Sequence, residues 1–130
     1  MGITSVLVVD DEPQLLHLTE GFLVRHGYQV VTCSSPEEAY RRFKQDAGAY
    51  TVAVIDLTLP VMSGKELAAK LLDLNPQLKL ILCSGYPFDP SQIPAAPREQ
   101  ILFLQKPFLP RMLTECIQRL VGGIAAAETA

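Results

Sequence analysis

Five short apolar runs, separated by longer stretches with helical spacing, constrain the fold of this chain more than any other feature. They lie at Val6–Val9, Val30–Thr32, Val52–Ile55, Leu78–Cys83 and Ile101–Leu104. Runs without polar alternation are typical of strands buried on both faces of a sheet. Parallel strands need crossovers, and the intervening stretches are long enough to supply them. The pattern predicts an α/β fold: an open, doubly wound, five-stranded parallel sheet with helices on both faces.

Proline, glycine and capping residues mark the expected helix ends. Glu12-Pro13 opens the first helix and Gly27 ends it. A capping box at Ser35–Glu38 opens the second, with the serine as the N-cap, the proline as the first helical residue and the last glutamate reaching back. Ser63–Lys65 leads into the third helix, and Asn75-Pro76 ends it.

The fourth crossover departs from this pattern. Its four prolines are Pro87, Pro90, Pro94 and Pro97. Proline removes a backbone donor and clashes with the preceding turn, so we expect one short helical piece there at most. An apolar stripe predicts the last helix and consists of Met112, Leu113, Cys116, Ile117 and Leu120. We expect the domain to span residues 1–123, followed by a disordered or tag-derived tail at 124–130.

Composition and charge exclude several classes of function. The 130 residues fit one domain, and the net charge of −3 argues against direct nucleic-acid binding. The apolar runs are too short to span a bilayer and the N-terminal residues lack the pattern of an export signal, so we expect neither membrane insertion nor export. The cysteines, Cys33, Cys83 and Cys116, have no metal-binding spacing, so a reducing cytoplasm is the expected compartment. His17 and His26 are expected at the surface or at a helix end.

Chemically reactive side chains follow four of the five predicted strands. Asp10 and Asp11 follow the first strand, Asp56 the third, Ser84 the fourth and Lys106 the fifth. Each of these residues alone is better explained by a helix cap, a turn or a loop. In sheets of this kind, however, ligands bind outside the carboxyl ends of the strands. The coincidence therefore predicts a functional site at that edge.

The residue types in this set indicate phosphoryl-transfer chemistry. Neighbouring carboxylates repel one another, so the site needs a cation or a raised carboxyl pKa, and ligands that are all oxygen suit Mg²⁺. A carboxylate such as that of Asp56 can attack phosphorus and form an acyl phosphate. Mg²⁺ and Lys106 would neutralise the phosphoryl oxygens, and Ser84 would donate a hydrogen bond to one of them.

Four segments of the chain resemble the receiver domains of two-component response regulators. They are Val6–Glu12, Ile55–Gly64, Cys83–Gly85 and Phe103–Phe108, and the resemblance runs from about Thr4 to Val121. It implies a flavodoxin-like form of the predicted α/β fold. It also implies a phosphoacceptor in signal transduction that assists only its own phosphorylation and dephosphorylation, and so is not an enzyme in the usual sense.

The resemblance also implies a role for each acidic residue. Asp56 looks like the phosphoacceptor and one of the Mg²⁺ ligands. Asp11 looks like the direct Mg²⁺ ligand, while Asp10 would act mainly through water. The carbonyl oxygen of Thr58 would be a further protein ligand.

The remaining site residues are similar to the parts of the family that respond to phosphate. Ser84 matches the hydroxyl that follows the phosphoryl group, and Lys106 matches its ion-pairing partner. The bond between Lys106 and Pro107 is expected to be cis. Phe103 occupies the position of the aromatic switch residue, with simple core packing as the alternative. Tyr86 could shield the acyl phosphate from water or could be an ordinary surface aromatic.

The partner implied by the resemblance is a histidine kinase or a histidine phosphotransfer domain. The stretch Phe103–Phe108 is similar to receivers appended to hybrid histidine kinases, and no output domain is expected within this chain. Residues 97–100 replace the usual small residue and glycine, which puts the ordinary dimer mode in doubt. Two other hypotheses stay open. One is an interaction domain that works without phosphate, and the other is a haloacid-dehalogenase-like hydrolase, which only the weak spacing of Asp10 and Glu12 favours.

Overall fold

The computed structural model describes residues 4–58, 62–87 and 98–121. The strands are β1 (Ser5–Val9), β2 (Gln29–Cys33), β3 (Val52–Asp56), β4 (Lys79–Ser84) and β5 (Ile101–Gln105). The α-helices of the described ranges are α1 (Pro13–Arg25), α2 (Pro36–Gln45), α3 (Gly64–Leu74) and α4 (Pro110–Val121). Short 3₁₀ turns follow at η1 (Ala47–Ala49) and η3 (Arg98–Gln100). All five predicted strands are confirmed, each within one residue at either end.

The five strands form one sheet in the order β2-β1-β3-β4-β5, and every neighbouring pair is parallel. The chain winds outward from β1 to β2, then returns and winds the other way from β3 to β5. The order therefore reverses between β1 and β3, which is where a sheet of this kind opens a crevice for ligands. The predicted doubly wound, flavodoxin-like fold is confirmed.

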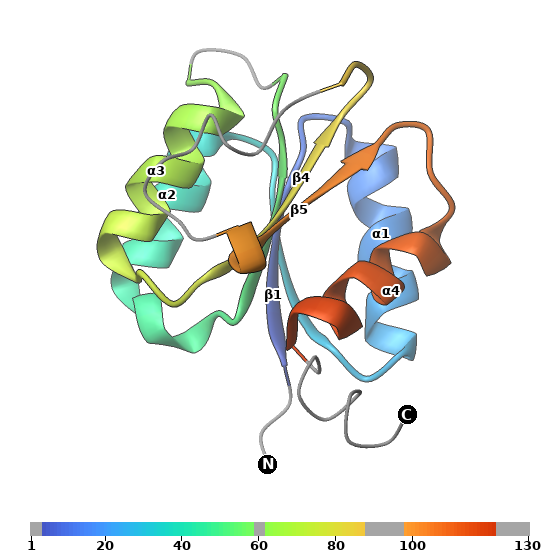
Figure 1. The fold of residues 1–130 in the computed structure, drawn as a ribbon, viewed down its shortest axis with the longest axis horizontal. Helices are drawn as coiled ribbons and strands as arrows, with labels where there is room; N and C mark the ends of the chain where they lie inside the picture. The colour runs from blue at the N-terminus through green and yellow to red at the C-terminus, as the bar shows by residue number, and fades with distance from the viewer. Residues whose placement is uncertain (1–3, 59–61, 88–97, 122–130) are drawn as a thin grey trace.

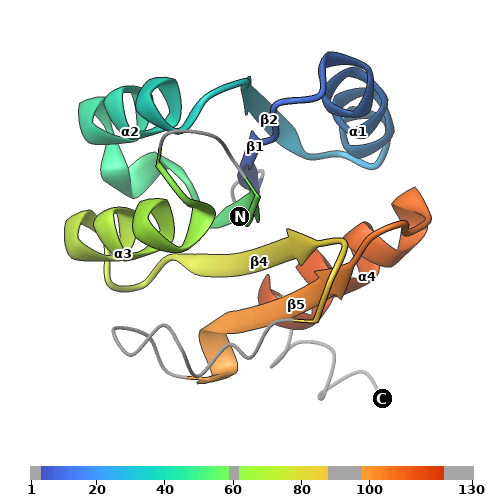
Figure 2. The same cartoon turned by 90° about the horizontal axis from the view of Figure 1, so that it is seen from above.

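Helices cover both faces of this sheet (Figures 1 and 2). Helices α2 and α3 pack on one face, and α1 and α4 pack on the other. Successive residues of β1 alternate between the two cores: Leu7 and Val9 lie in the core beneath α2 and α3, whereas Val6 and Val8 lie in the core beneath α1 and α4. Burial on both faces explains why the strands read as unbroken apolar runs.

The predicted helix ends are confirmed in detail. Gly27 follows α1 with a φ of 91°, and its amide and that of Tyr28 bond back to the last turn, which only glycine does without strain. The backbone N–H of Glu38 donates to Ser35 Oγ at 3.2 Å, as a capping box requires. The Glu38 carboxylate reaches back to the N–H of Ser34 (3.2 Å), one residue further than the usual box.

Some sequence predictions need correction or fall outside the described residues. Met112 is 38% exposed, so it does not belong to the buried stripe of α4, and Thr114 is buried instead. Leu113, Ile117 and Leu120 follow the helical spacing of four and three residues and form the buried face of α4. Met112 precedes this series by one residue, so its side chain points away from the core. The crossover prediction concerns mainly residues 88–97, and the tail prediction concerns 124–130. Both stretches, like the domain boundary at 123, lie outside the described residues.

No helix in the described ranges is long and apolar enough to cross a bilayer. The three cysteines are free and buried. Burial raises the pKa of Cys83 to about 12 and that of Cys33 to about 11.

These buried thiols predict a loss of stability in alkali. Above pH 9.0, the ordinary thiol pKa, the unfolded chain releases protons that the folded chain keeps. The free energy of unfolding should thus be unaffected by the thiols below that pH, and should fall by about 1.4 kcal/mol per pH unit for each fully buried thiol above it. Urea unfolding at pH 8 and pH 10 measures this. An identical slope in a Cys83→Val variant would contradict it.

Candidate functional site

The carboxyl ends of the central strands place the predicted site residues at one edge of the sheet. Asp56 is the last residue of β3 and pairs with Cys83 on β4, directly before Ser84. The backbone N–H of Lys106 donates to the carbonyl oxygen of Ser84 at 2.7 Å, which fixes the end of β5 beside that of β4. Asp10 follows β1 on the opposite side of β3. The sequence prediction that these residues share one edge is confirmed.

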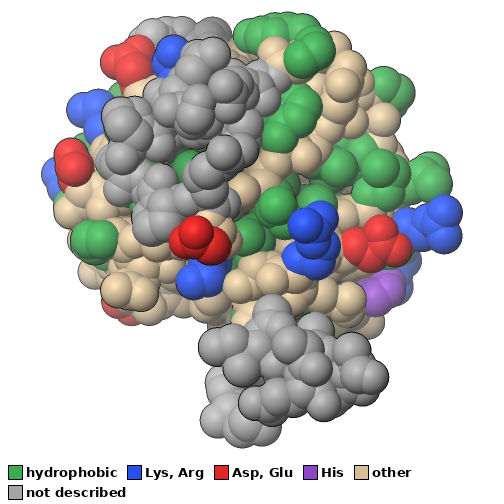
Figure 3. All heavy atoms as spheres, in the orientation of Figure 1, with side chains coloured by type: hydrophobic (Ala, Val, Ile, Leu, Met, Phe, Trp, Pro, Cys, Tyr) green, Lys and Arg blue, Asp and Glu red, His purple; other side chains and the backbone are tan. Residues whose placement is uncertain are grey.

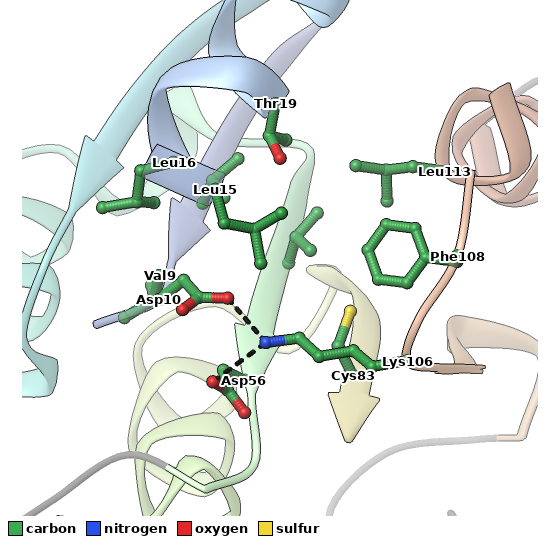
Figure 4. Close-up of a pocket in the computed structure, with 12 residues that line it drawn as sticks. Val9, Asp10, Leu15, Leu16, Thr19, Asp56, Cys83, Lys106, Phe108 and Leu113 are labelled. Carbon is green, nitrogen blue, oxygen red and sulfur yellow. Dashed lines mark hydrogen bonds and ion pairs between the residues drawn. The ribbon is translucent and has the colours of Figure 1, made fainter. Parts of the chain in front are cut away.

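The ammonium group of Lys106 bridges two of the carboxylates (Figure 4). Its Nζ lies 2.9 Å from Asp10 Oδ2 and 3.2 Å from Asp56 Oδ2. Both aspartates are buried, with exposures of 6% and 3%. A buried carboxylate is stable only when it is paired, so the lysine compensates charges that would otherwise repel each other.

The same contacts set the protonation state of Lys106. Burial by itself lowers the pKa of this lysine, but the hydrogen bonds that it donates to Asp10 and Asp56 and the charges of these two carboxylates outweigh that effect and raise the pKa above 10.5. The side chain is therefore cationic at neutral pH. Because the shift is upward, the stability that it contributes is present below pH 10.5 and is lost only as the pH rises through the higher folded value.

Three carboxylates form a candidate metal cluster at this edge. Asp10, Asp11 and Asp56 each place one oxygen within 4.8 Å of the others. Asp11 is exposed, whereas the other two are buried. With the lysine, the set carries three negative charges and one positive charge, a net charge of −2. Its donors are all oxygen, so the residues fit a hard divalent cation such as Mg²⁺.

A tight turn after β3 fixes the carboxylate of Asp56. The backbone N–H of Thr58 donates to Asp56 Oδ1 at 3.0 Å, and the Thr58 hydroxyl donates to the same oxygen at 2.8 Å. Thr58 itself is exposed. The sequence predicted only the carbonyl oxygen of Thr58 as a metal ligand. The hydrogen bond from the Thr58 hydroxyl to Asp56 was not predicted.

The residues implied to respond to phosphate lie on β4, on β5 and in the turn after β4. Ser84 is fully buried, and its Oγ accepts a hydrogen bond from the backbone N–H of Tyr86 at 3.1 Å. Phe103 is half-buried on β5 and packs against the core beneath α2 and α3. Tyr86 is 54% exposed. The peptide bond between Lys106 and Pro107 is cis, as predicted.

The two histidines lie apart from this set. His17 is exposed on α1. His26 caps the end of α1, where its ring stacks on Phe22 with centroids 4.3 Å apart and its Nδ1 bonds to the Phe22 carbonyl at 2.9 Å. The predicted surface and helix-end positions are confirmed.

The model of the response regulator receiver domain family matches residues 6–118. The chain belongs to this receiver domain family. Membership establishes a phosphoacceptor domain of two-component signalling. It agrees with the cluster of carboxylates and lysine at the edge of the sheet.

Relatives with curated functions include regulators that are longer than this receiver domain. The chain is 32% identical to the transcriptional regulatory protein FixJ of Rhizobium meliloti over 124 residues, which cover 95% of the chain and 60% of that protein. It is 25% identical to the chemotaxis protein CheY of Thermotoga maritima over 116 residues, covering 88% and 95%. The chain thus spans little more than half the length of several relatives but nearly all of CheY.

Solved receiver structures share the fold. A CheY-like receiver domain from Methanospirillum hungatei superposes with a TM-score of 0.80 at 28% identity, covering 91% of this chain and 93% of that one. The response regulator TrrA of Thermotoga maritima, solved in complex with Mg²⁺ and BeF, superposes with a TM-score of 0.77 at 30% identity, covering 92% and 100%.

Gly64, which the sequence predicts only as the start of a helix, lies directly against the backbone at the end of β3. A Cβ on Gly64 would lie 2.7 Å from Leu57 Cα and would collide with the backbone carbonyl of Asp56. These neighbours are backbone atoms at the end of β3 and cannot turn aside. Gly64 therefore lets the start of α3 approach the end of β3 closely.

Replacing Gly64 by Ala should lower the free energy of unfolding by about 1–3 kcal/mol, the usual cost of overpacking. Urea denaturation followed by circular dichroism measures this. The matched control is Gly21→Ala, because Gly21 is exposed within α1 and a Cβ there meets nothing within 4 Å. That variant should gain about 0.5–1 kcal/mol from helix propensity. Equal stability of the two variants would contradict the close approach.

Proposed function

We propose that Asp56 accepts a phosphoryl group from a phosphohistidine of a histidine kinase or a histidine phosphotransfer domain, with Mg²⁺ bound beside it. The observation that carries the proposal is the bridge from Lys106 Nζ to Asp10 Oδ2 and Asp56 Oδ2 next to the exposed carboxylate of Asp11. This arrangement supplies a nucleophile, a fixed cation and oxygen ligands for a second cation at a single point.

The hydrogen bonds suggest how the carboxylates divide the work of holding Mg²⁺. Asp10 Oδ1 already accepts from the N–H of Glu12 at 3.0 Å, and Oδ2 accepts from Lys106. Asp11 is exposed and is the better placed to give an oxygen directly, which supports the expectation that Asp10 acts mainly through water. Asp56 and the carbonyl of Thr58 would complete the protein ligands. When bound, Mg²⁺ would neutralise charge on the phosphoryl oxygens.

In the proposed transfer, one carboxylate oxygen of Asp56 attacks phosphorus. The new oxygen–phosphorus bond forms as the bond between phosphorus and the donor's imidazole nitrogen breaks, and that nitrogen keeps the electron pair. Lys106 holds a positive charge against the phosphoryl oxygens throughout. The hydroxyl of Ser84 accepts from Tyr86 in this structure, and its own proton is available for a phosphoryl oxygen.

We propose that Phe103 is the side chain that changes position when the domain is phosphorylated. Its half-buried position on β5, one strand beyond Ser84, supports a side chain that can move inward when the serine is drawn toward the phosphate. Core packing without switching remains the alternative role of this residue.

Membership of the receiver domain family supports a signalling role over hydrolysis of a small substrate. The hydrolase hypothesis rests only on the weak spacing of Asp10 and Glu12.

The surface around the site supports a protein as the phosphoryl donor. Exposed apolar side chains gather in the upper right of Figure 3, where the loops after β4 and β5 lie in Figure 1. Tyr86 and Leu109, in these loops, are each 54% exposed. Exposed apolar groups beside a reactive centre favour contact with another protein. We place this exchange in the cytoplasm, where a reducing environment keeps the three cysteines as free thiols.

Incubation with a small acyl phosphate and Mg²⁺ tests the proposal. Intact-protein mass spectrometry should show a gain of one phosphoryl group, and chelating the Mg²⁺ should prevent it. An unchanged mass in the presence of Mg²⁺ would favour an interaction domain that works without phosphate. Release of free phosphate over many turnovers, without a labelled protein, would favour a hydrolase.

A further inference from the structure

The carboxylate of Asp56 has little hydrogen-bonding capacity left in this structure. A carboxylate has about four acceptor sites, two on each oxygen. The Thr58 N–H and the Thr58 hydroxyl occupy both sites of Oδ1, at 3.0 and 2.8 Å. Lys106 Nζ occupies one site of Oδ2, at 3.2 Å. Within the described residues, these three bonds leave one acceptor site, on Oδ2.

The proposed function needs two such sites at the same time. One oxygen of Asp56 must attack phosphorus, and an acceptor site must also face Mg²⁺. If one oxygen takes phosphorus and the other faces Mg²⁺, Oδ1 must take one of the two, whichever oxygen attacks. Both acceptor sites of Oδ1 are held by Thr58, so loading the domain requires one of these two donors to leave.

The Thr58 hydroxyl is the donor best able to leave. The backbone N–H of Thr58 belongs to the turn after β3 and cannot rotate independently. Lys106 bonds to the other oxygen, Oδ2, so its movement to the phosphoryl group would open no site on Oδ1. The hydroxyl, in contrast, turns about a single bond, and Thr58 is exposed, so water can take over its hydrogen bond.

We propose that the Thr58 hydroxyl is a latch on Asp56. It holds Oδ1 in the unloaded domain, competes with Mg²⁺ and the phosphoryl group for this carboxylate, and turns away when both bind. Thr58 is thus a positioning residue that acts through Asp56. The inference rests on the proposed role of Asp56 as the phosphoacceptor.

Two substitutions separate the hydroxyl from the rest of the side chain. Thr58→Val keeps the branched shape and removes the hydroxyl, whereas Thr58→Ser keeps the hydroxyl. A hydrogen bond to a charged group is strong enough that its removal should lower the apparent Kd by roughly tenfold. The probe is beryllofluoride, titrated by calorimetry at one fixed, subsaturating Mg²⁺ concentration, so that the Kd reports both ligands.

The latch predicts tighter binding in Thr58→Val and parent-like binding in Thr58→Ser. Unchanged or weaker binding in Thr58→Val, when the parent binds, would overturn the latch and leave the phosphoacceptor role intact. Tighter binding in both variants would also overturn it, because the effect would then not come from the hydroxyl. A parent protein that binds no beryllofluoride would refute the phosphoacceptor role, and the latch with it.

Discussion

Replacing Asp56 by Asn should abolish phosphoryl uptake from a small acyl phosphate. The amide has no anionic oxygen to attack phosphorus, so the loss should be complete. The fold should survive, because Asn has the same shape and its Oδ1 can still accept from the N–H of Thr58, as Asp56 Oδ1 does at 3.0 Å. Intact-protein mass spectrometry measures the uptake, and urea denaturation confirms that the variant is folded.

The matched control for this prediction is Asp73→Asn. Asp73 is exposed on α3, away from the carboxyl ends of the strands, so this variant should gain a phosphoryl group as fast as the parent. Persistent uptake by a folded Asp56→Asn variant would show that another residue is the acceptor. Equal loss in both variants would show that the assay does not report on the site.

Replacing Lys106 by Met should slow phosphorylation by about 10²–10³-fold, the usual effect of removing one group that stabilises charge in a transition state. Methionine preserves much of the aliphatic stem and removes the ammonium group that lies 2.9 Å from Asp10 and 3.2 Å from Asp56. The two carboxylates would then repel each other, and the phosphoryl oxygens would lose their fixed cation. The rate of mass gain at saturating Mg²⁺ measures the effect.

Lys79→Met is the control for the lysine prediction. Lys79 begins β4, at the end of the strand opposite Ser84, so its charge should not influence the reaction. The account predicts a normal rate for this variant and a stability within about 0.5 kcal/mol of the parent, as for ordinary surface changes. If Lys106→Met reacted as fast as Lys79→Met, the bridge would be a structural ion pair without a part in the chemistry.

The order of the fold could be predicted because its strands are buried on both faces. Val6–Val9 and Val52–Ile55 have no polar residue, so their type and limits were visible without tertiary information. Because the strands were predicted to be parallel, Asp10, Asp56 and Lys106 were expected at the same edge of the sheet. In the structure, Lys106 lies within hydrogen-bonding distance of both aspartates. The grouping of the site residues thus followed from topology.

Details that depend on packing could not be predicted. The collision that a Cβ on Gly64 would have with the end of β3 depends on how closely α3 approaches the sheet. The hydroxyl of Thr58 bonds to Asp56 because the turn folds back on itself, and no residue pattern requires this. The sequence placed Met112 in an apolar stripe, yet its side chain is exposed because neighbouring residues of α4 occupy the buried face.

Locating the phosphoryl group tests the central claim most directly. After brief treatment with acyl phosphate and Mg²⁺, reduction with borohydride converts an aspartyl phosphate to homoserine, which survives proteolysis and peptide mass spectrometry. The account predicts homoserine at position 56 and unmodified aspartate at Asp10 and Asp11. Homoserine at either of these two positions, or a phosphoryl group on His17 or His26, would contradict it.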